Sequence, residues 1–282
     1  MNNIQSLSLE EFKNLPEVIE GESKEIRYLG EGDVAIKLKP TVYSFTHNRT
    51  GEIEGTDWLR LQASKILSEQ LALNGINHAY RHFSDSFIQA QLVLQPPTKD
   101  QPYPFRPDDI SDEELSKLAV APPIEVVVKD RHVGTPKHRY YKFGNYPTRE
   151  GLYIQPEDIY PETTVRFDWR NPMHDERGNR LADEVLGEEM ANWFINVKTA
   201  RQTARKAFSV LQTFMKSRGI DLWDICFFIS EDGETMFGEI SQDCGRYRLL
   251  DTTNSLDKDV WRQGGSGEQV TEKWRQFLDL IS

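Results

Sequence analysis

Residues 122–139 read PPIEVVVKDRHVGTPKHR, and we expect the remainder of the chain to be arranged around this segment. Two prolines precede Ile124 and the β-branched run 126–128, a pattern that predicts a short buried strand because such side chains pack well in a pleated sheet. A turn at residues 133–135 follows, and the basic or imidazole side chains around it are Lys129, Arg131, Lys137, His138 and Arg139. A turn with a glycine, a hydroxyl, free backbone donors and nearby cations suits a phosphate group. A buried strand that continues into a solvated basic loop is the alternative without a functional role.

The composition is that of an acidic globular protein in which this basic segment is a local exception. The 282 residues can hold one large domain or two lobes. Hydrophobic residues make up 38% of the chain and charged residues 28%, values that are typical of a soluble protein. The net charge of -11 argues against a general nucleic-acid binder, so we predict a small-molecule partner and no nucleic acid.

The cysteines and the apolar runs predict a cytoplasmic protein without a membrane partner. Cys226 and Cys244 form no CxxC pair, and no apolar leader follows Met1, so a reducing compartment is the simplest setting. No apolar run approaches the length of about 18 residues that a membrane-spanning helix needs.

Residues 1–121 predict an antiparallel sheet with one long helix. The pattern favours strands at 18–28 and 34–38, a helix at 56–74 that stops at Gly75, and further strands at 76–80 and 87–94. A capping box at residues 8–11 predicts a short helix before the first strand. A proline-rich crossing at 95–121 contains a short acidic helix near residues 111–118. Lys24 lies beside a glycine turn and is available to a nucleotide phosphate, although a plain hairpin explains the same pattern.

Residues 122–282 predict a second lobe with a long core helix at 188–218. A strand at 165–169 runs into a polar loop with Arg170, His174 and Asp175, for which a functional loop and a salt-bridged surface turn are both open. A hairpin of 220–229 and 235–240 should carry residues 238–246 into a cleft. The final helix, 268–281, has an apolar face that either docks on its own domain or meets another copy of the chain.

Segments along nearly the whole chain resemble the SAICAR synthetase (phosphoribosylaminoimidazole-succinocarboxamide synthase) family. The segment GEISQDCGRYRLLD at 238–251, followed by SLDKDVWRQ at 255–263, is similar to the closing signature of that family. The other matching segments, in the same order as in the family, are EGESKEIR at 20–27, GEIEG at 51–55, NGI at 74–76, SDS at 84–86, PPIEVVVKDRHVGT at 122–135, RNPMHD at 170–175 and GIDLWD at 219–224.

The resemblance implies an α/β (α+β) fold of two lobes, 1–121 and 122–282, with antiparallel sheets, long helices and a nucleotide cleft like that of kinases or ATP-grasp enzymes. It implies an ATP-dependent ligase: ATP activates the carboxylate of a phosphoribosyl carboxyaminoimidazole, and the amine of aspartate attacks to form an amide. ATP and Mg2+ are the implied cofactors, an amino acid is an implied partner, and the family's self-association makes a homo-oligomer an open expectation.

The matching motifs also imply roles for individual residues. Arg170 and Asp175 would lie near the amino acid and, together with Lys129, form the predicted catalytic set. The backbone at Gly21 and the side chain of Lys24 would meet the phosphates of ATP. The ribotide would be bound by Lys129, Thr135, Arg139, Asp243, Arg246, Lys258, Asp259 and Arg262.

Departures from the family pattern are concentrated on the nucleotide side. Glu22 replaces a lysine of the glycine-rich turn, and Phe228 and Gly238 stand where the family has carboxylates expected at magnesium. Magnesium depends on charged oxygen ligands, so Glu239 is the candidate that remains for a metal ligand. The run Arg60-Leu61-Gln62 replaces the family's Asn-Asn-Lys on the first long helix, and Lys129 replaces an arginine.

These departures leave two alternatives to the ligase. One is an enzyme of the same fold, a lyase or hydrolase, that acts on a phosphoribosylated or nucleoside monophosphate without ATP. The other is a nucleotide-binding module that performs no turnover.

Overall fold

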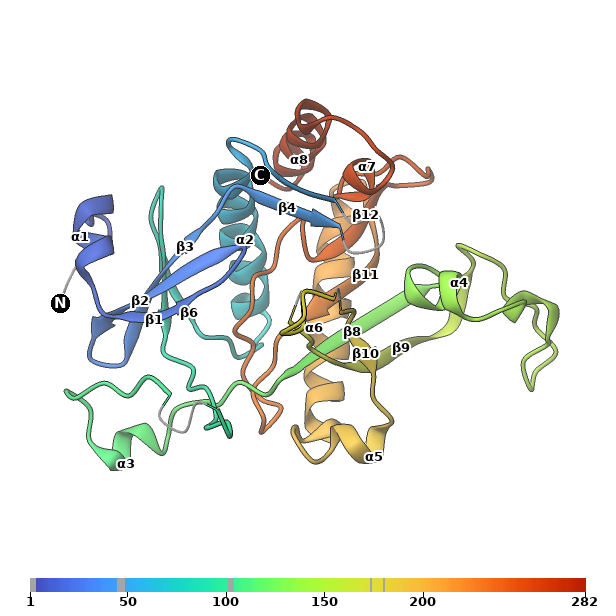
Figure 1. The fold of residues 1–282 in the computed structure, drawn as a ribbon. Coiled ribbons are helices and arrows are strands. Elements are labelled where there is room, and N and C mark those ends of the chain that lie inside the picture. Colours follow the sequence, from blue (N-terminus) through green and yellow to red (C-terminus); the bar gives the residue numbers. More distant parts are fainter. Residues whose placement is uncertain (1–3, 45–48, 101–103, 173, 180) are drawn as a thin grey trace.

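The chain folds into two five-stranded antiparallel sheets, a two-stranded ribbon and a set of helices (Figure 1). The computed structural model describes residues 4–44, 49–100, 104–172, 174–179 and 181–282. Residues 101–103 of the predicted proline-rich crossing, Met173 of the polar loop and the side chain of Thr135 lie outside the described part.

The first sheet contains strands that precede residue 92, in the order β1-β2-β3-β7-β6. Apolar side chains of β3 are buried, and Asp33 at its start pairs with Arg81 at 3.0 Å. The bounds are β1 Glu17–Glu20, β2 Lys24–Gly30, β3 Asp33–Leu38, β6 Tyr80–Phe83 and β7 Ile88–Gln91; the separate ribbon consists of β4 Thr41–Ser44 and β5 Arg49–Glu52.

The second sheet contains strands that follow residue 123, in the order β10-β9-β8-β11-β12, so the predicted strand at 124–128 lies at its centre. Ile124, Val126 and Val128 are fully buried, as expected for β-branched residues in a central strand. The bounds are β8 Ile124–Arg131, β9 Ile159–Trp169, β10 Glu184–Val185, β11 Ile220–Phe227 and β12 Gly245–Leu249.

The capping box predicted at residues 8–11 is present, and two further helices begin with the same arrangement. Ser8, Ser111 and Ser266 each form a capping box, and Gly75 follows α2 with a φ of +68°. The bounds are α1 Leu9–Asn14, α2 Thr56–Leu73, α3 Asp112–Leu115, α4 Thr135–Arg139, α5 Glu188–Ala191, α6 Val197–Ser217, α7 Asp259–Arg262 and α8 Gly267–Ile281, with a 3-10 turn at Phe143–Asn145.

One continuous hydrophobic core joins both sheets to α2, α6 and α8. Val270, Trp274, Phe277 and Ile281 on α8 are buried in it, and α8 packs on α2. The apolar face of the last helix therefore docks within the chain. No helix among the described residues is long and apolar enough to cross a membrane.

Three predicted elements are wrong in detail. The predicted helix 188–218 breaks before Val197, where Asn196 caps α6 by accepting a bond from the Thr199 amide at 3.1 Å. The predicted strands 76–80 and 235–240 form no regular strands outside Tyr80; instead the two segments bond to each other, with the Ala79 amide 2.8 Å from the Met236 carbonyl oxygen. Residues 245–249, and not 235–240, form the strand that pairs with β11, with Ile220 opposite Leu249.

Candidate functional site: the polar face of the second sheet

The two faces of the second sheet differ because residues of a strand alternate between them. Helix α6 covers one face: Gln212 donates to Asp130 at 3.0 Å, and Arg205 donates to the carbonyl of Thr163 at 3.1 Å. On the opposite face, β8 carries Glu125 and Lys129. That face holds charged groups, which the core helix leaves uncovered.

Lys129, Asp224 and Arg246 meet on this polar face. The register places Lys129 on β8 opposite Asp224 on β11, and Asp224 opposite Arg246 on β12. The ammonium of Lys129 binds Asp224, and Nη1 of Arg246 lies 2.6 Å from Oδ2 of the same carboxylate. Burial would raise the pKa of Asp224, but Arg246 and Lys129 hold it well below its ordinary value. Asp224 is therefore ionised at neutral pH and fixes both cations.

A second carboxylate, Asp259 at the start of α7, gathers arginines beside this group. It binds Arg248 and Arg262, and Nε of Arg246 lies 3.7 Å from its Oδ2. Burial opposes ionisation, yet the arginines at 246, 262 and 248 lower the pKa of Asp259 to about 2. We call Lys129, Asp224, Arg246, Asp259 and Arg262 the cationic cluster. The side chains of Arg246 and Arg262 remain partly exposed, at 18% and 21%, so these two can reach a ligand.

The turn after β8 lies directly against the cationic cluster. A Cβ built on Gly134 would lie 3.1 Å from Nη1 of Arg246 and 3.3 Å from Nζ of Lys129. Gly134 also has a φ of +66°, which side chains rarely tolerate, so both space and conformation favour glycine. Thr135 follows as the first residue of α4. The sequence therefore correctly predicted that this turn and the last quarter of the chain converge.

Other predicted site residues have contacts outside this cluster. Lys258 pairs with Asp243 at 3.2 Å, so these two predicted residues lie together. Arg139 instead pairs with Glu184 on β10 at 3.1 Å, and both side chains are exposed. Asp175 closes its own loop, accepting bonds from the Arg177 and Asn179 amides at 2.9 and 2.7 Å. The structure shows no contact that joins Asp175 to Arg170 among the described residues.

Glu125 lies on the polar face, opposite Asp168 on β9. Burial, with the negative charge of Asp183, raises the pKa of Glu125 to about 7, although Arg170 and Lys258 act in the other direction. Its side chain thus changes charge close to neutral pH.

Lys24 and Arg170 both lie near the ring of Phe228. Nζ of Lys24 lies 5.9 Å from the ring centroid, and the guanidinium carbon of Arg170 lies 4.6 Å from it. Burial lowers the pKa of Lys24, Glu239 opposes this effect, and the charge of Arg170 lowers the pKa further. Gly21 forms the preceding turn, in which its amide donates to the Lys24 carbonyl at 2.9 Å.

Glu239, the predicted metal ligand, is the partner of Arg60 on α2. Nε of Arg60 donates to one carboxylate oxygen at 2.7 Å and Nη2 to the other at 2.5 Å, and Ser241 donates to the first oxygen as well. Burial would raise the pKa of Glu239, but Arg60 lowers it to about 2. Both carboxylate oxygens of Glu239 thus accept bonds from the Arg60 guanidinium, which argues against the predicted metal-ligand role of Glu239.

The residues in this region do not fit a magnesium ion. Magnesium in nucleotide sites is held through one or two carboxylates together with phosphates and water. No group of three or more His, Cys, Asp or Glu side chains suited to a metal occurs in the described ranges. Lys24, Arg60 and Arg170 instead bring positive charge to the place where a cation would have to bind.

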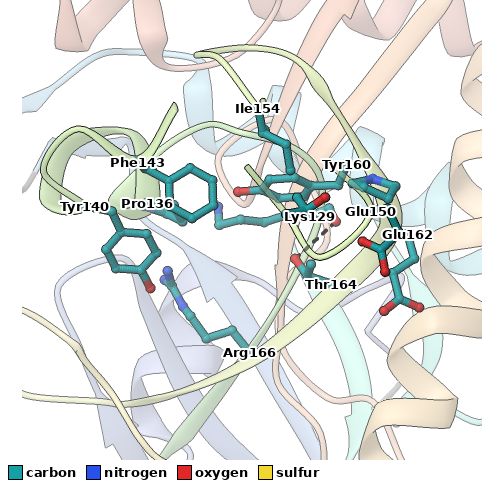
Figure 2. Close-up of a pocket in the computed structure, with 12 residues that line it drawn as sticks. Lys129, Pro136, Tyr140, Phe143, Glu150, Ile154, Tyr160, Glu162, Thr164 and Arg166 are labelled. Atoms are coloured by element: carbon teal, nitrogen blue, oxygen red, sulfur yellow. Dashed lines mark hydrogen bonds between the residues drawn. The ribbon is translucent and has the colours of Figure 1, made fainter. Parts of the chain in front are cut away.

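A pocket of about 410 Å³ opens on the same polar face, next to Lys129. Figure 2 shows the rings of Tyr140, Phe143 and Tyr160 gathered around it, with Lys129 reaching in among them. Its other lining residues are Pro136, Thr148, Glu150, Ile154, Pro161, Glu162, Thr164 and Arg166. The tyrosine-rich segment that follows α4 thus forms the wall of a cavity.

Three charged residues in this region had no predicted site role: Asp224, Arg248 and Arg60. Asp224 stands in the apolar strand IDLWDICF, and buried charges in proteins are paired, so it signalled a hidden cation. Arg248 binds Asp257 and lies 4.7 Å from the ring of Trp223. Arg60 is fully buried on the inner face of α2, which gives the same signal.

Comparison with known proteins agrees with this geometry. A sequence model described as SAICAR synthetase matches residues 17–279. The chain is 28% identical to bifunctional cordycepin biosynthesis cluster protein 3 of Cordyceps militaris, over 95% of this chain but only 33% of that protein. It is 27% identical to phosphoribosylaminoimidazole-succinocarboxamide synthase of Thermococcus sibiricus, over 87% of this chain and 90% of that protein. A solved structure described as SAICAR synthetase (type-2) in complex with ADP superposes with a TM-score of 0.71 at 22% identity, over 94% of this chain and 97% of that one, which shows a shared fold.

The match of the family model extends over nearly the whole chain, including both sheets and the cationic cluster. It confirms the resemblance found in the ordered motifs, and the structural neighbour confirms the predicted mixed α/β fold with antiparallel sheets. The chain belongs to the SAICAR synthetase family.

Proposed function

We propose that this protein is an ATP-dependent carbon–nitrogen ligase that joins an amine, aspartate in the family, to the carboxylate of a phosphoribosyl imidazole-type substrate. This reaction class is the one that the family name and the Thermococcus relative carry. The observation that carries the proposal is the cationic cluster, which places Lys129 and Arg246 against the glycine turn at 134 and holds Arg262 beside Arg246 through Asp259.

The ribotide phosphate would bind at Arg246, Arg262 and the backbone at Thr135. Arginine forms strong paired hydrogen bonds with phosphate, and the exposed edges of these two side chains leave donors free. Asp224 and Asp259 behind them hold the guanidinium groups in place, so binding requires little ordering. Lys258 and Asp243 would form the far wall, and the aromatic pocket beside Lys129 suits a planar heterocycle.

The nucleotide and the amino acid would bind at the opposite end of the polar face. Lys24 and the backbone at Gly21 are assigned to the ATP phosphates, and Arg170 and Asp175 to the side near the amine. Support comes from the ammonium of Lys24, which has no ion pair or hydrogen bond among the described residues and so is available to an anion.

The proposal includes two lobes, 1–121 and 122–282, a cytoplasmic location and self-association. The separation of the strands into one sheet before residue 92 and another after residue 123 supports the lobe boundary. The two cysteines are free thiols, as expected in a reducing compartment. Exposed aromatic side chains at Tyr141 and Tyr146 offer a surface on which copies could meet.

Incubation with ATP, aspartate and phosphoribosyl carboxyaminoimidazole tests the proposal by mass spectrometry of the products. We expect ADP and the succinocarboxamide to form together. The variant Arg246→Ala should lower kcat/KM by about 10- to 150-fold, because a charge-assisted contact contributes about 1.5–3 kcal/mol.

Arg275→Ala is the matched control, because Arg275 lies on the exposed side of α8 and should leave kcat/KM unchanged. Consumption of a ribotide monophosphate without ATP would overturn the ligase in favour of a lyase or hydrolase. Equal activity of the Arg246 and Arg275 variants would refute the placement of the phosphate.

A further inference from the structure

The Arg60–Glu239 pair is closed to outside ligands. The Arg60 side chain is fully buried, and its third nitrogen, Nη1, donates to the carbonyl oxygens of Lys39 and Thr41 at 2.9 and 3.3 Å. Every nitrogen of the guanidinium thus has a partner within the fold. A divalent cation at Glu239 would have to displace this pair or share it at close range with a fixed positive charge, which Coulomb repulsion disfavours.

The wall next to Glu239 is apolar and filled. A Cβ built on Gly238 would lie 2.0 Å from Cδ2 of Phe228 and 2.7 Å from its Cβ, so no side chain fits at residue 238 while the ring stays in place. The Phe228 ring also packs on Phe237, with centroids 5.9 Å apart. Neither residue 228 nor residue 238 has a side-chain oxygen that could bind a metal. The ring of Phe228 fills the space that a side chain at residue 238 would need.

Two cations without ion-pair partners flank this ring, one from each sheet. Lys24 opens β2, and Arg170 follows β9. In the described portion of the chain neither side chain forms an ion pair or a hydrogen bond. Glu239 acts on Lys24, and Glu125 and Asp183 act on Arg170, only at longer range. Two like charges held on one ring repel each other, and an anion between them would remove that repulsion.

We propose that Lys24 and Arg170 bind the phosphate groups of the nucleotide directly, and that the protein holds no magnesium ion there because Arg60 already neutralises Glu239. The inference rests on the proposed function in that a nucleotide binds at this place. Arg60 neutralises the charge of Glu239, and Lys24 and Arg170 neutralise the charge of the phosphates, which a metal ion would otherwise do.

Isothermal titration of the protein with ADP tests this inference. One titration uses buffer with 5 mM MgCl2 and the other uses buffer with EDTA, both at a protein concentration about 10-fold above the expected Kd. We expect the two Kd values to agree within about twofold, because the described residues around Lys24 and Arg170 offer the metal no free carboxylate. Lys24→Met and Arg170→Met should each weaken ADP binding in EDTA by about 10-fold or more, since each removes a charge-assisted contact.

Lys65→Met, at an exposed position on α2, is the control for Lys24→Met. Arg177→Met, at an exposed position in the loop after β9, is the control for Arg170→Met, and both control variants should bind ADP as the wild type does. A Kd that rises tenfold or more when magnesium is removed would overturn the inference and leave the ligase proposal standing. Absence of ADP binding in both buffers would overturn the inference together with the ATP part of the proposed function.

The converse variant provides a test that is independent of the nucleotide. Arg60→Asn combined with Phe228→Glu frees Glu239 and adds a carboxylate beside it. Mn2+ titration followed by electron paramagnetic resonance should show no ion bound by the wild type and one bound by the double variant. Binding of Mn2+ by the wild type with a Kd that Glu239→Gln weakens would contradict the inference.

Discussion

At the scale of single residues, Glu125 shows how the polar face controls protonation. Its pKa rises from 4.5 to about 7, through burial first and then through Asp183. Between these values the folded protein keeps a proton that the unfolded chain has released. Stability from this group is therefore complete below the unfolded pKa and is lost as the pH rises through about 7.

Glu125→Gln should abolish this loss. Between pH 5 and pH 8 the free energy of unfolding of the wild type should fall by about 1–3 kcal/mol more than that of the variant, since one pKa unit corresponds to about 1.4 kcal/mol. Urea unfolding at both pH values measures the difference. Glu69→Gln, on an exposed position of α2, is the control and should follow the wild type. Parallel pH profiles for the wild type and Glu125→Gln would show that Glu125 does not retain its proton.

At the scale of elements, the turn between β8 and α4 combines two separate requirements for glycine. Gly134 has a left-handed φ, and its Cα faces Arg246 and Lys129 at close range. Gly219, which ends α6, has a similar φ of +73° but nothing within 4 Å of a built Cβ. A comparison of alanine variants at Gly134 and Gly219 therefore separates the effect of backbone strain from the effect of contact with the cationic cluster.

Gly219→Ala should cost about 1–2 kcal/mol of stability through backbone strain alone. Gly134→Ala should cost at least as much and, in addition, lower kcat/KM by about tenfold, because the methyl group displaces Arg246 by a few tenths of an ångström. Thermal unfolding and steady-state kinetics of both variants measure the two effects. Unchanged kinetics in Gly134→Ala would show that the arginine moves without consequence.

The elements also differ in how well their sequence patterns predict them. Helix α2 follows from its periodic apolar residues and the glycine at 75, and helix α8 follows from its periodic apolar residues. The long helix was predicted to start at 188, yet Met190 and Phe194 are 46% and 38% exposed, and Phe194 packs edge-to-face on Trp169 with the ring centroids 5.1 Å apart. The apolar spacing of α6 extends back to residue 190 because the short helix α5 before Asn196 has apolar residues at the same spacing. The break between α5 and α6 depends on a hydrogen bond from the Asn196 amide to the Glu231 carbonyl oxygen, which is distant in the sequence.

At the scale of the whole molecule, Arg60 and Glu239 link the two halves of the chain. Arg60 lies on α2, which belongs to the first half, and Glu239 lies between β11 and β12 of the second sheet. Their ion pair is enclosed by the core that joins both sheets. A buried pair of this kind adds little net stability, but removal of one partner leaves an uncompensated charge.

Arg60→Met should therefore lower the free energy of unfolding by about 3–5 kcal/mol, because Glu239 remains buried without a counter-charge. Arg60→Met combined with Glu239→Leu should recover most of that loss, since the double variant buries no charge. Urea unfolding of the single and double variants measures both values. A double variant as unstable as Arg60→Met would mean that the hydrogen bonds to Lys39 and Thr41, and not the charge, provide the stability.

Local patterns in the sequence were sufficient for the central strand of the second sheet, the capped helices, the glycine turn and the family. Each depends on neighbours a few residues apart, where spacing and side-chain shape act directly. The order of the motifs also predicted that the turn at 133–135 and Arg246 lie together, and the structure places Gly134 against Arg246.

The partners of buried charges were settled only by packing. Glu239 was predicted to bind a metal, and the folded chain places Arg60 against it from 179 positions away. Likewise, the matched fit of Phe228 and Gly238 and the pairing of Asp224 with Lys129 and Arg246 are invisible in the linear order. The physical reason is that the free energy of a buried charge depends on which opposite charge the completed core brings within hydrogen-bonding distance, and local propensity contains no term for that.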